Sequence, residues 1–271
     1  WMLTPYNAAY VRYVVYYGYD NYGSPTTSFG SRPSINLKSA VKIIDGDGTS
    51  NNPYRLEGDT DNTAGALLST RYSGEYIRFG TGDNNLYRIV SHENGTGTKI
   101  TSAVPLKDNG SYKTIAFGDN AIFSKDNTIG TFLNGDYLTS DTYLTSDQLN
   151  MIEDNTTWYL GTVGDANYKL AKYQDTASSS ITTTTTTAKV GLLRLGELMA
   201  GQFDKDGNNT TYWTLTPYST SNVRNVDSNG YSDNNSPTYS NGSRPSMNLK
   251  STVTIVSGKG TKSDPFVLSG N

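Results

Sequence analysis

One segment of the chain occurs twice, and this repeat constrains the fold more than any other feature. Residues 1–58 align without a gap with residues 213–270, at a constant offset of 212 positions, and 31 of the 58 aligned residues are identical. A fixed offset over such a length indicates a repeated structural unit. We therefore interpret residues 1–59 as the C-terminal part of a preceding repeat unit, and residues 60–271 as a complete unit.

The differences between the two copies gather at residues 7–29 and 219–241. Identical residues form a frame there: Val11/Val223, Arg12/Arg224, Val14/Val226, Gly18/Gly230, Tyr19/Tyr231 and Ser24-Pro25-Thr26/Ser236-Pro237-Thr238. Around the frame, the first copy carries mainly aromatic residues, namely Tyr10, Tyr13, Tyr16, Tyr17, Tyr22 and Phe29. The second copy carries a more polar set, namely Asn222, Asn225, Asp227, Asn229, Asp233, Asn234 and Tyr239.

Exchangeable residues of these types on a fixed frame are typical of a recognition surface. Tyrosine supplies rigid contact area, while serine, asparagine and glycine supply adaptable hydrogen bonds. We predict that both sets are ligand-binding residues, with the aromatic side chains of the first copy as anchors. The alternative is that these are loop positions that drifted apart after duplication, because loops vary more than the elements they connect.

Composition excludes several classes of function. The formal net charge of -3 gives no basic footprint, so we expect no nucleic-acid partner. The absence of cysteine excludes disulfides, thiolate metal sites and cysteine nucleophiles. No apolar run is long enough to span a membrane in this fragment. The Tyr-, Thr-, Asn- and Gly-rich, charge-poor composition favours an extracellular location.

Strand signals dominate the pattern, so the expected fold class is α+β and strand-rich. We predict strands near residues 41–43, 53–56, 76–80, 86–90, 99–105, 189–195, 253–255 and 265–268. A helix is predicted over 145–152 with Ser146 as its N-cap, and short helical turns over 131–135 and 196–201. The threonine run at 182–187 is compatible with an exposed loop or an edge strand.

A series of short motifs covers most of residues 76–270. They are Ile77-x-Phe79-Gly80, Tyr87-Arg88-Ile89-Val90, Phe132-Leu133-Asn134-Gly135, Leu144 to Ile152, Val190 to Glu197, Tyr212-Trp213-x-Leu215-x-Pro217 and Gly242-x-Arg244-Pro245-x-x-Asn248-Leu249-Lys250. In this order they resemble a widespread domain of surface and pilus-associated proteins of Gram-positive and gut bacteria. The Trp…Gly-x-Arg ending is similar to the close of C-type-lectin-like domains of the formylglycine-generating-enzyme type. The resemblance implies a compact lectin-like fold whose segment between the Trp strand and the Gly-x-Arg strand forms an exposed, ligand-facing surface.

The chain also resembles the variable proteins of diversity-generating retroelements. In that group the C-terminal lectin-like segment is rewritten mainly at Asn-type codons, which yields Tyr, Ser, Asp, Gly, Thr, Ala, Val or Phe. Every mismatched residue at 7–29 and 219–241 is Asn or belongs to that set. The chain departs from the group in one respect, because it carries such a segment at each end.

The residue inventory argues against an enzyme. His92 is the only histidine, and its Ser-His-Glu-Asn-Gly context is typical of a turn. No spacing singles out a pair of carboxylates for glycoside hydrolysis. The formylglycine-generating activity needs cysteines, so it is not carried over. We expect no cofactor.

For three further groups of residues, we favour a structural role over a functional one. Asp204, Asp206 and Asn208 have the spacing that begins a calcium loop but lack its glycine and its final glutamate, so they form only a weak calcium candidate. Trp1 and Trp213 are expected to be core strand residues. The paired arginines Arg12/Arg224 and Arg32/Arg244 are expected to hold loops through hydrogen bonds.

The sequence therefore predicts an adhesin-like binding domain whose partner is a protein or a carbohydrate on a cell surface. The competing prediction is a structural subunit of a bacterial fibre or pilus that associates with itself. In that case the 1–59 piece would pack on a neighbouring unit, because unpaired strand edges must be covered.

Overall fold

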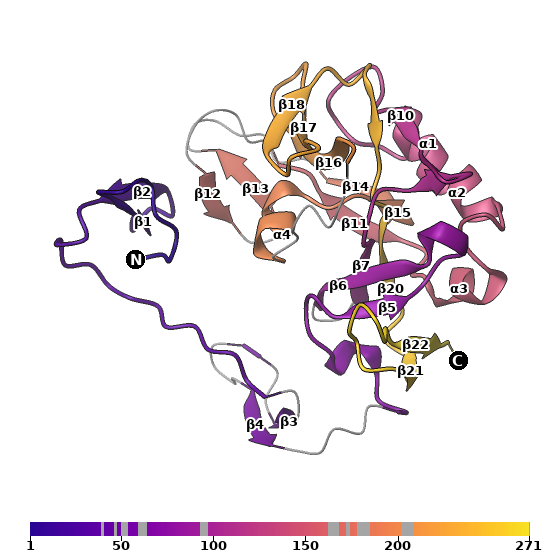
Figure 1. Cartoon of the computed structure of the whole chain (residues 1–271), viewed down its shortest axis with the longest axis horizontal. Helices are drawn as coiled ribbons and strands as arrows, with labels where there is room; N and C mark the ends of the chain where they lie inside the picture. Colours follow the sequence, from indigo (N-terminus) through magenta and orange to yellow (C-terminus); the bar gives the residue numbers. More distant parts are fainter. Residues whose placement is uncertain are drawn as a thin grey trace.

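The computed structural model describes residues 1–38, 41–45, 48–49, 54–58, 64–92, 97–161, 168–171, 174–177, 185–201 and 209–270. It is rich in strands, with 35% strand and 13% helix in a few short pieces (Figure 1). This confirms the strand-rich composition that we expected. Most of the described chain from residue 64 onward is built around two five-stranded sheets.

The first sheet brings the beginning of the complete unit together with its end. Its order is β15-β20-β7-β6-β5, and all its pairs are antiparallel. The strands are β5 (Tyr76–Arg78), β6 (Leu86–His92), β7 (Thr98–Ser102), β15 (Val190–Gly191) and β20 (Ser246–Leu249). The repeated segment thus supplies β20, which lies between β15 and β7 and is buried along its whole length.

The second sheet contains the strands that frame the exchanged residues. Its order is β10-β19-β16-β17-β18. The strands are β10 (Thr114–Ala116), β16 (Tyr212–Pro217), β17 (Val223–Val226), β18 (Ser232–Asn235) and β19 (Ser240–Gly242). All residues of β16 and β17 are buried, whereas β18 forms an edge and is partly exposed.

Two-stranded pairs make up the remaining strand structure. They are β1 (Val11–Val14) with β2 (Asp20–Gly23), β3 (Val41–Asp45) with β4 (Arg55–Gly58), β8 (Lys107–Asp108) with β9 (Ser111–Tyr112), β11 (Thr156–Tyr159) with β14 (Thr185–Ala188), β12 (Tyr168–Ala171) with β13 (Gln174–Ala177), and β21 (Thr254–Ser257) with β22 (Val267–Ser269). The described end of the threonine run lies in β14, so that part is a strand rather than a loop.

The helices are short and end within two turns. They are α1 (Thr128–Asn134), α2 (Asp136–Thr139), α3 (Ser146–Met151) and α4 (Leu195–Ala200), with 3-10 turns at Leu68–Thr70 and Gly82–Asn84. The N-cap prediction for α3 was wrong by one residue. Thr145 is the cap, because its hydroxyl accepts from the Gln148 amide while the Gln148 side chain accepts from the Thr145 amide.

Two other local predictions also need correction. His92 is the last residue of β6 and does not lie in a turn; its Nδ1 lies 3.0 Å from Thr98 Oγ1 and its Nε2 2.5 Å from the Arg71 carbonyl. Burial lowers the pKa of His92, although the Arg71 carbonyl and Glu75 oppose that shift. The predicted strand at 189–195 is only β15, because Leu195 already begins α4.

The main hydrophobic core joins the two sheets to α1, α2 and α3, and Leu198 of α4 lies in a second, smaller cluster. The largest fully buried side chains of the main core are Trp158, Trp213, Tyr87, Tyr137 and Phe79. The Tyr87 and Tyr137 hydroxyls lie 2.5 Å apart and so satisfy each other inside the core. Trp213 is a core strand residue, as predicted. Trp1 lies outside the strands and is only half-buried, so the same prediction was wrong for the first copy.

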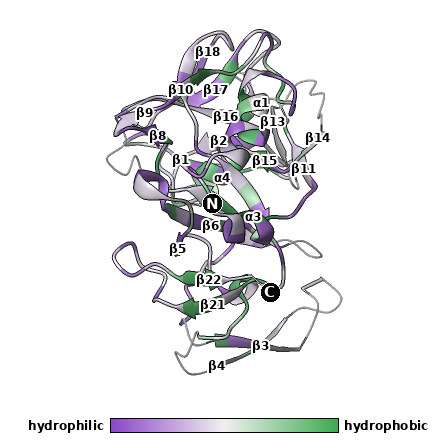
Figure 2. Cartoon of the chain, turned by 90° about the vertical axis from the view of Figure 1, so that its right-hand side faces the viewer, coloured by the Kyte–Doolittle hydropathy of each residue, from purple (hydrophilic) through white to green (hydrophobic). Residues whose placement is uncertain are grey.

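The two copies form the same local hairpins. The register Arg12↔Tyr22 in β1–β2 matches Arg224↔Asn234 in β17–β18 at the offset of the repeat. The register Lys42↔Glu57 in β3–β4 matches Thr254↔Ser269 in β21–β22, and both of these hairpins shift register after the following isoleucine. Figure 2 shows the hydrophobic residues of β21 and β22 in green. Local sequence therefore determines these hairpins independently of what they pack against.

The two copies nevertheless differ in the solvent exposure of their apolar side chains. Leu215 and Leu249 are fully buried, whereas their counterparts Leu3 and Leu37 are 102% and 52% exposed. Met247 is fully buried, and its counterpart Ile35 is 79% exposed. The same apolar residues thus form a core in residues 213–270 and a surface in residues 1–58.

A nearly buried ion pair joins β7 to α4. Lys99 Nζ lies 2.7 Å from Glu197 Oε1, and about a tenth of each side chain is exposed. The other carboxylate oxygen of Glu197 accepts from the Arg194 amide at 2.9 Å. Burial alone would raise the pKa of Glu197, but Lys99 and Arg194 together lower it. The carboxylate is therefore charged in the folded protein at neutral pH.

Replacing Glu197 by Gln should lower the free energy of unfolding by about 3–5 kcal/mol, because it leaves the Lys99 ammonium buried without its counter-ion. The matched control is Asp154→Asn, which breaks the ion pair between Asp154 and Lys189. The Asp154 carboxylate is mostly exposed, so its loss should cost much less than the loss of Glu197. Urea unfolding at pH 7 measures both. Equal losses in the two variants would contradict the assigned role of the Lys99–Glu197 pair.

Candidate recognition face

The hairpin β17–β18 presents most of the exchanged residues of the second copy. Its turn is closed by the Gly230 amide, which donates to the Asp227 carbonyl at 3.0 Å. The equivalent bond from Gly18 to Val15 is 2.8 Å long in the first copy. Gly230 and Gly18 have φ values of 91° and 87°, a region in which other residues are strained. The frame glycines are therefore required by the turn itself.

A second shared turn follows each hairpin. The Ser24 and Ser236 hydroxyls lie 2.8 and 2.9 Å from those of Thr26 and Thr238. Each serine carbonyl also accepts an amide three residues later at 3.0 Å. The identical Ser-Pro-Thr residues thus fix the same turn in both copies.

The predicted residues of the second copy lie at three depths. Asn229, Asp233 and Tyr239 are exposed, with Tyr239 at 60%. Asn222, Asp227 and Asn234 are half-buried. Asn225 is fully buried, so its side chain does not lie on the exposed face with the others.

The surface also includes a residue that the sequence comparison did not assign to it. Tyr231 is 71% exposed, although it is identical to Tyr19 and was counted in the frame. Its position directly after the turn glycine could have identified it as a tip residue. We call Asn229, Tyr231, Asp233 and Tyr239 the polar face.

Exchanged residues that contact one another differ together between the copies. Asn222 donates from Nδ2 to Asn234 Oδ1 at 2.6 Å, and the equivalent rings of Tyr10 and Tyr22 lie 5.6 Å apart, edge to face. An asparagine pair has thus been replaced as a unit by an aromatic pair. Both kinds of pair fit across the same two strands.

A second pair of exchanged positions lies beneath the face. Asn225 and Asn241 are buried, and neither amide atom of Asn225 nor Nδ2 of Asn241 has a hydrogen-bond partner among the described residues. Their counterparts are Tyr13 and Phe29, whose rings stack 4.2 Å apart. Asn241 was not among the predicted site residues, and the sequence alone gave no sign that these polar groups would be buried.

The first copy forms an aromatic face. Tyr16 and Tyr17 are 86% and 62% exposed, and Tyr10, Tyr22 and Phe29 are each more than 40% exposed. Tyr6, a frame residue, stacks on Tyr22 with ring centroids 3.9 Å apart. We call Tyr10, Tyr16, Tyr17 and Tyr22 the aromatic face; Phe29 stacks on half-buried Tyr13, whose side chain points to the opposite side of the hairpin from Tyr22.

The prediction that the paired arginines make structural hydrogen bonds is confirmed for Arg244 and Arg12. Buried Arg244 donates to the carbonyls of Ser102 and Ala103 at 2.9 and 2.6 Å. Arg224 lies over the ring of Tyr218 at 4.5 Å. In the first copy, Arg12 forms an ion pair with Asp20 and lies over Tyr6.

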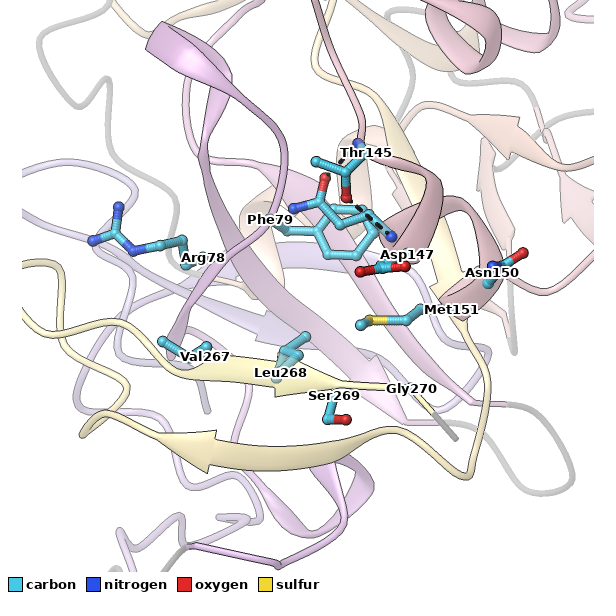
Figure 3. A pocket seen from close by; sticks show the side chains of 11 residues that line it. Arg78, Phe79, Thr145, Asp147, Asn150, Met151, Val267, Leu268, Ser269 and Gly270 are labelled. Atoms are coloured by element: carbon cyan, nitrogen blue, oxygen red, sulfur yellow. Dashed lines mark hydrogen bonds between the residues drawn. The ribbon is translucent and has the colours of Figure 1, made fainter. Parts of the chain in front are cut away.

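A pocket of about 380 Å³ lies away from both faces, between α3 and β22 (Figure 3). Asp147, Asn150 and Met151 of α3 face Leu268 and Ser269 across it. Gly270 closes one side, where a Cβ would come within 2.7 Å of Met151. Its lining also includes the charged side chain of Arg78 and the hydroxyl-bearing Thr145.

Metal ligation and membrane insertion can be judged only for the described part of the chain. The weak calcium candidate of Asp204, Asp206 and Asn208 lies outside the described residues. Elsewhere, no group of three or more acidic or histidine side chains is arranged to hold a metal ion within the described ranges. None of the helices given above is long and apolar enough to cross a membrane.

Comparisons with protein-family models, with curated proteins and with solved structures find no match to this chain. The candidate faces therefore depend on the geometry of the two copies alone.

Exchange at surface positions should be tolerated, whereas change in the frame should not. The double variant Asn222→Tyr with Asn234→Tyr reproduces the first-copy pair and should change the free energy of unfolding by less than about 1 kcal/mol. Gly230→Val should lower it by about 1–3 kcal/mol, because valine is strained at positive φ. Urea unfolding measures both, and a double variant as damaging as Gly230→Val would contradict the division into frame and exchanged positions.

Proposed function

We propose that this protein is a surface-displayed, adhesin-like binding module that presents exchangeable side chains on a fixed hairpin scaffold. One observation carries the proposal: the hairpins β1–β2 and β17–β18 keep the same register and the same glycine turn although their outer residues differ. A scaffold that tolerates such changes can alter what it binds without altering its fold. Side chains of Tyr, Asn and Asp suit protein and carbohydrate ligands alike.

The proposal includes a lectin-like fold for residues 64–270. It is supported by the parallel pairing of Tyr212 with Gly242, which places the Trp strand next to the Gly-x-Arg strand with the variable hairpin between them in sequence. An experimental structure with a different arrangement of the two sheets would remove this part of the proposal.

The binding test uses the labelled full chain against an array of glycans and a panel of purified cell-surface proteins. We expect saturable binding to at least one member of the array or the panel. Tyr231→Ala with Tyr239→Ala on the polar face, or Tyr16→Ala with Tyr17→Ala on the aromatic face, should weaken it at least about tenfold. Tyr159→Ala, an exposed tyrosine outside both faces, is the matched control.

A second candidate function is that of a structural subunit, and the exposed apolar side chains of Leu3, Ile35 and Leu37 favour it. A surface of this kind is usually covered by another protein surface. Binding and sedimentation-velocity measurements on the same purified protein decide between the two candidate functions. Absence of binding together with concentration-dependent assembly in sedimentation velocity would replace the adhesin proposal by the fibre one.

A further inference from the structure

Residues 213–270 pack against the rest of the unit, and we call the part of the unit that contacts them the slot. We call residues 64–201 the scaffold, residues 213–270 the C-terminal segment and residues 1–58 the N-terminal segment. In the slot, β20 pairs with β7 and β15, and Arg244 bonds to the Ser102 and Ala103 carbonyls. The C-terminal segment therefore completes the first sheet of the scaffold.

Most polar contacts in the slot are made by the scaffold backbone. The Gly65 and Leu68 amides donate to the carbonyls of Ile255 and Val253, each at 2.8 Å. The Phe266 amide donates to the Tyr76 carbonyl at 2.9 Å, and the Arg78 amide donates to the Phe266 carbonyl at 2.8 Å. Backbone contacts of this kind are available to any segment of the same shape.

The N-terminal segment carries most of the side chains that fill the slot. The buried residues of the C-terminal segment that it repeats identically include Trp213, Leu215, Thr216, Val223, Arg224, Val226, Ser243, Arg244, Ser246, Asn248, Leu249, Val253 and Ile255. Other buried positions differ: Met247 and Phe266 are replaced by Ile35 and Tyr54, and Thr214 is replaced by Met2. Its hairpins already have the required registers.

The connection to the scaffold is long enough for the N-terminal segment to occupy the slot of its own chain. In the seated segment Ser269 pairs with Thr254, and Thr254 bridges Leu67. Two strand spacings of about 4.8 Å thus separate position 269 from Leu67, or about 10 Å. Glu57 is the equivalent of Ser269, and ten residues of chain lead from it to Leu67, which can span about 33 Å.

We propose that the slot accepts either segment, and that the N-terminal segment can displace the C-terminal segment within one chain. The seated hairpin then carries the aromatic face in place of the polar face. The exchange itself is independent of the proposed binding function, although it would decide which face the scaffold supports. Amide atoms of buried Asn225 and Asn241 lack hydrogen-bond partners, which makes packing of the C-terminal segment in the slot less favourable. When the N-terminal segment occupies the slot, the slot must instead accommodate the larger rings of Tyr13 and Phe29.

The test uses the full chain, which has no cysteine of its own. Ser246 Oγ and Thr101 Oγ1 lie 2.8 Å apart, so cysteines at these two positions can form a disulfide. Ser34 is the equivalent of Ser246. The double variant Ser34→Cys with Thr101→Cys should therefore form a disulfide within the chain, more slowly than Ser246→Cys with Thr101→Cys.

Oxidation is followed in a glutathione buffer at several protein concentrations, and the bridge is identified by peptide mass mapping. Ser28→Cys with Thr101→Cys is the control for unspecific oxidation, because Ser28 lies in an exposed loop. A rate of intrachain disulfide formation that does not depend on protein concentration supports the exchange. A rate no higher than that of the Ser28 control would overturn it, as would bridges formed only between chains, which would assign the N-terminal segment to a second copy.

A pair of variants tests the same proposal without cysteines. Leu249→Asp places a charge in the core of the seated segment, but exchange should let the chain retain cooperative unfolding. Leu37→Asp with Leu249→Asp disables both segments and should abolish that transition, while Leu37→Asp alone should have no effect. If Leu249→Asp alone abolishes the transition, the N-terminal segment does not occupy the slot.

Discussion

The insertion of β20 between β7 and β15 is the interaction on which the rest of the structure depends. It joins residues 98–102 to residues 246–249, which are far apart in the chain, and so closes the first sheet. Arg244 fixes this insertion, because its guanidinium donates to the carbonyls of Ser102 and Ala103 at the end of β7. Gly97 permits the close approach, since a Cβ there would overlap the Leu249 carbonyl at 1.3 Å. The arginine and the last serine of the repeated Gly-Ser-Arg-Pro-Ser motif thus have structural roles that require no ligand.

The repeat separates what local sequence determines from what tertiary contacts determine. The hairpin registers are the same in both copies, and so are the turns of β1–β2 and β17–β18, because they depend on glycine, proline, serine and threonine at fixed places. Strand β20 has no counterpart in residues 34–37, which carry the same pattern of residues but are exposed. A strand in the middle of a sheet therefore forms only where neighbouring strands are available to pair with it, whereas a hairpin forms by itself.

Sequence patterns predicted the parts of the fold that rest on short-range rules. β5, β6, β7 and the helix α3 were found near their true positions, and the buried position of Trp213 and the carbonyl hydrogen bonds of Arg244 followed from residue type. The patterns failed where a distant contact decides the outcome. The sequence of β11 shows no strong alternation of apolar and polar residues, and the strand forms through its pairing with β14. The N-cap of α3 was misassigned because Thr145 and Ser146 are both good cap residues. The burial of Asn225 also could not be predicted, since asparagine is ordinarily a surface residue.

The central claim is that the frame is fixed by folding and that the exchanged positions are free to vary. The frame glycines, the Ser-Pro-Thr turns and the frame arginines have assigned structural roles, whereas the outer residues of β1–β2 and β17–β18 differ in pairs without disturbing the hairpins. The most direct test is the coding DNA of residues 7–29 and 219–241 in several sister strains. The account predicts amino-acid changes confined to the exchanged positions, mostly in the first two bases of Asn-type codons. Substitutions spread evenly over frame and exchanged codons alike would contradict it and would identify the two copies as drifting repeats.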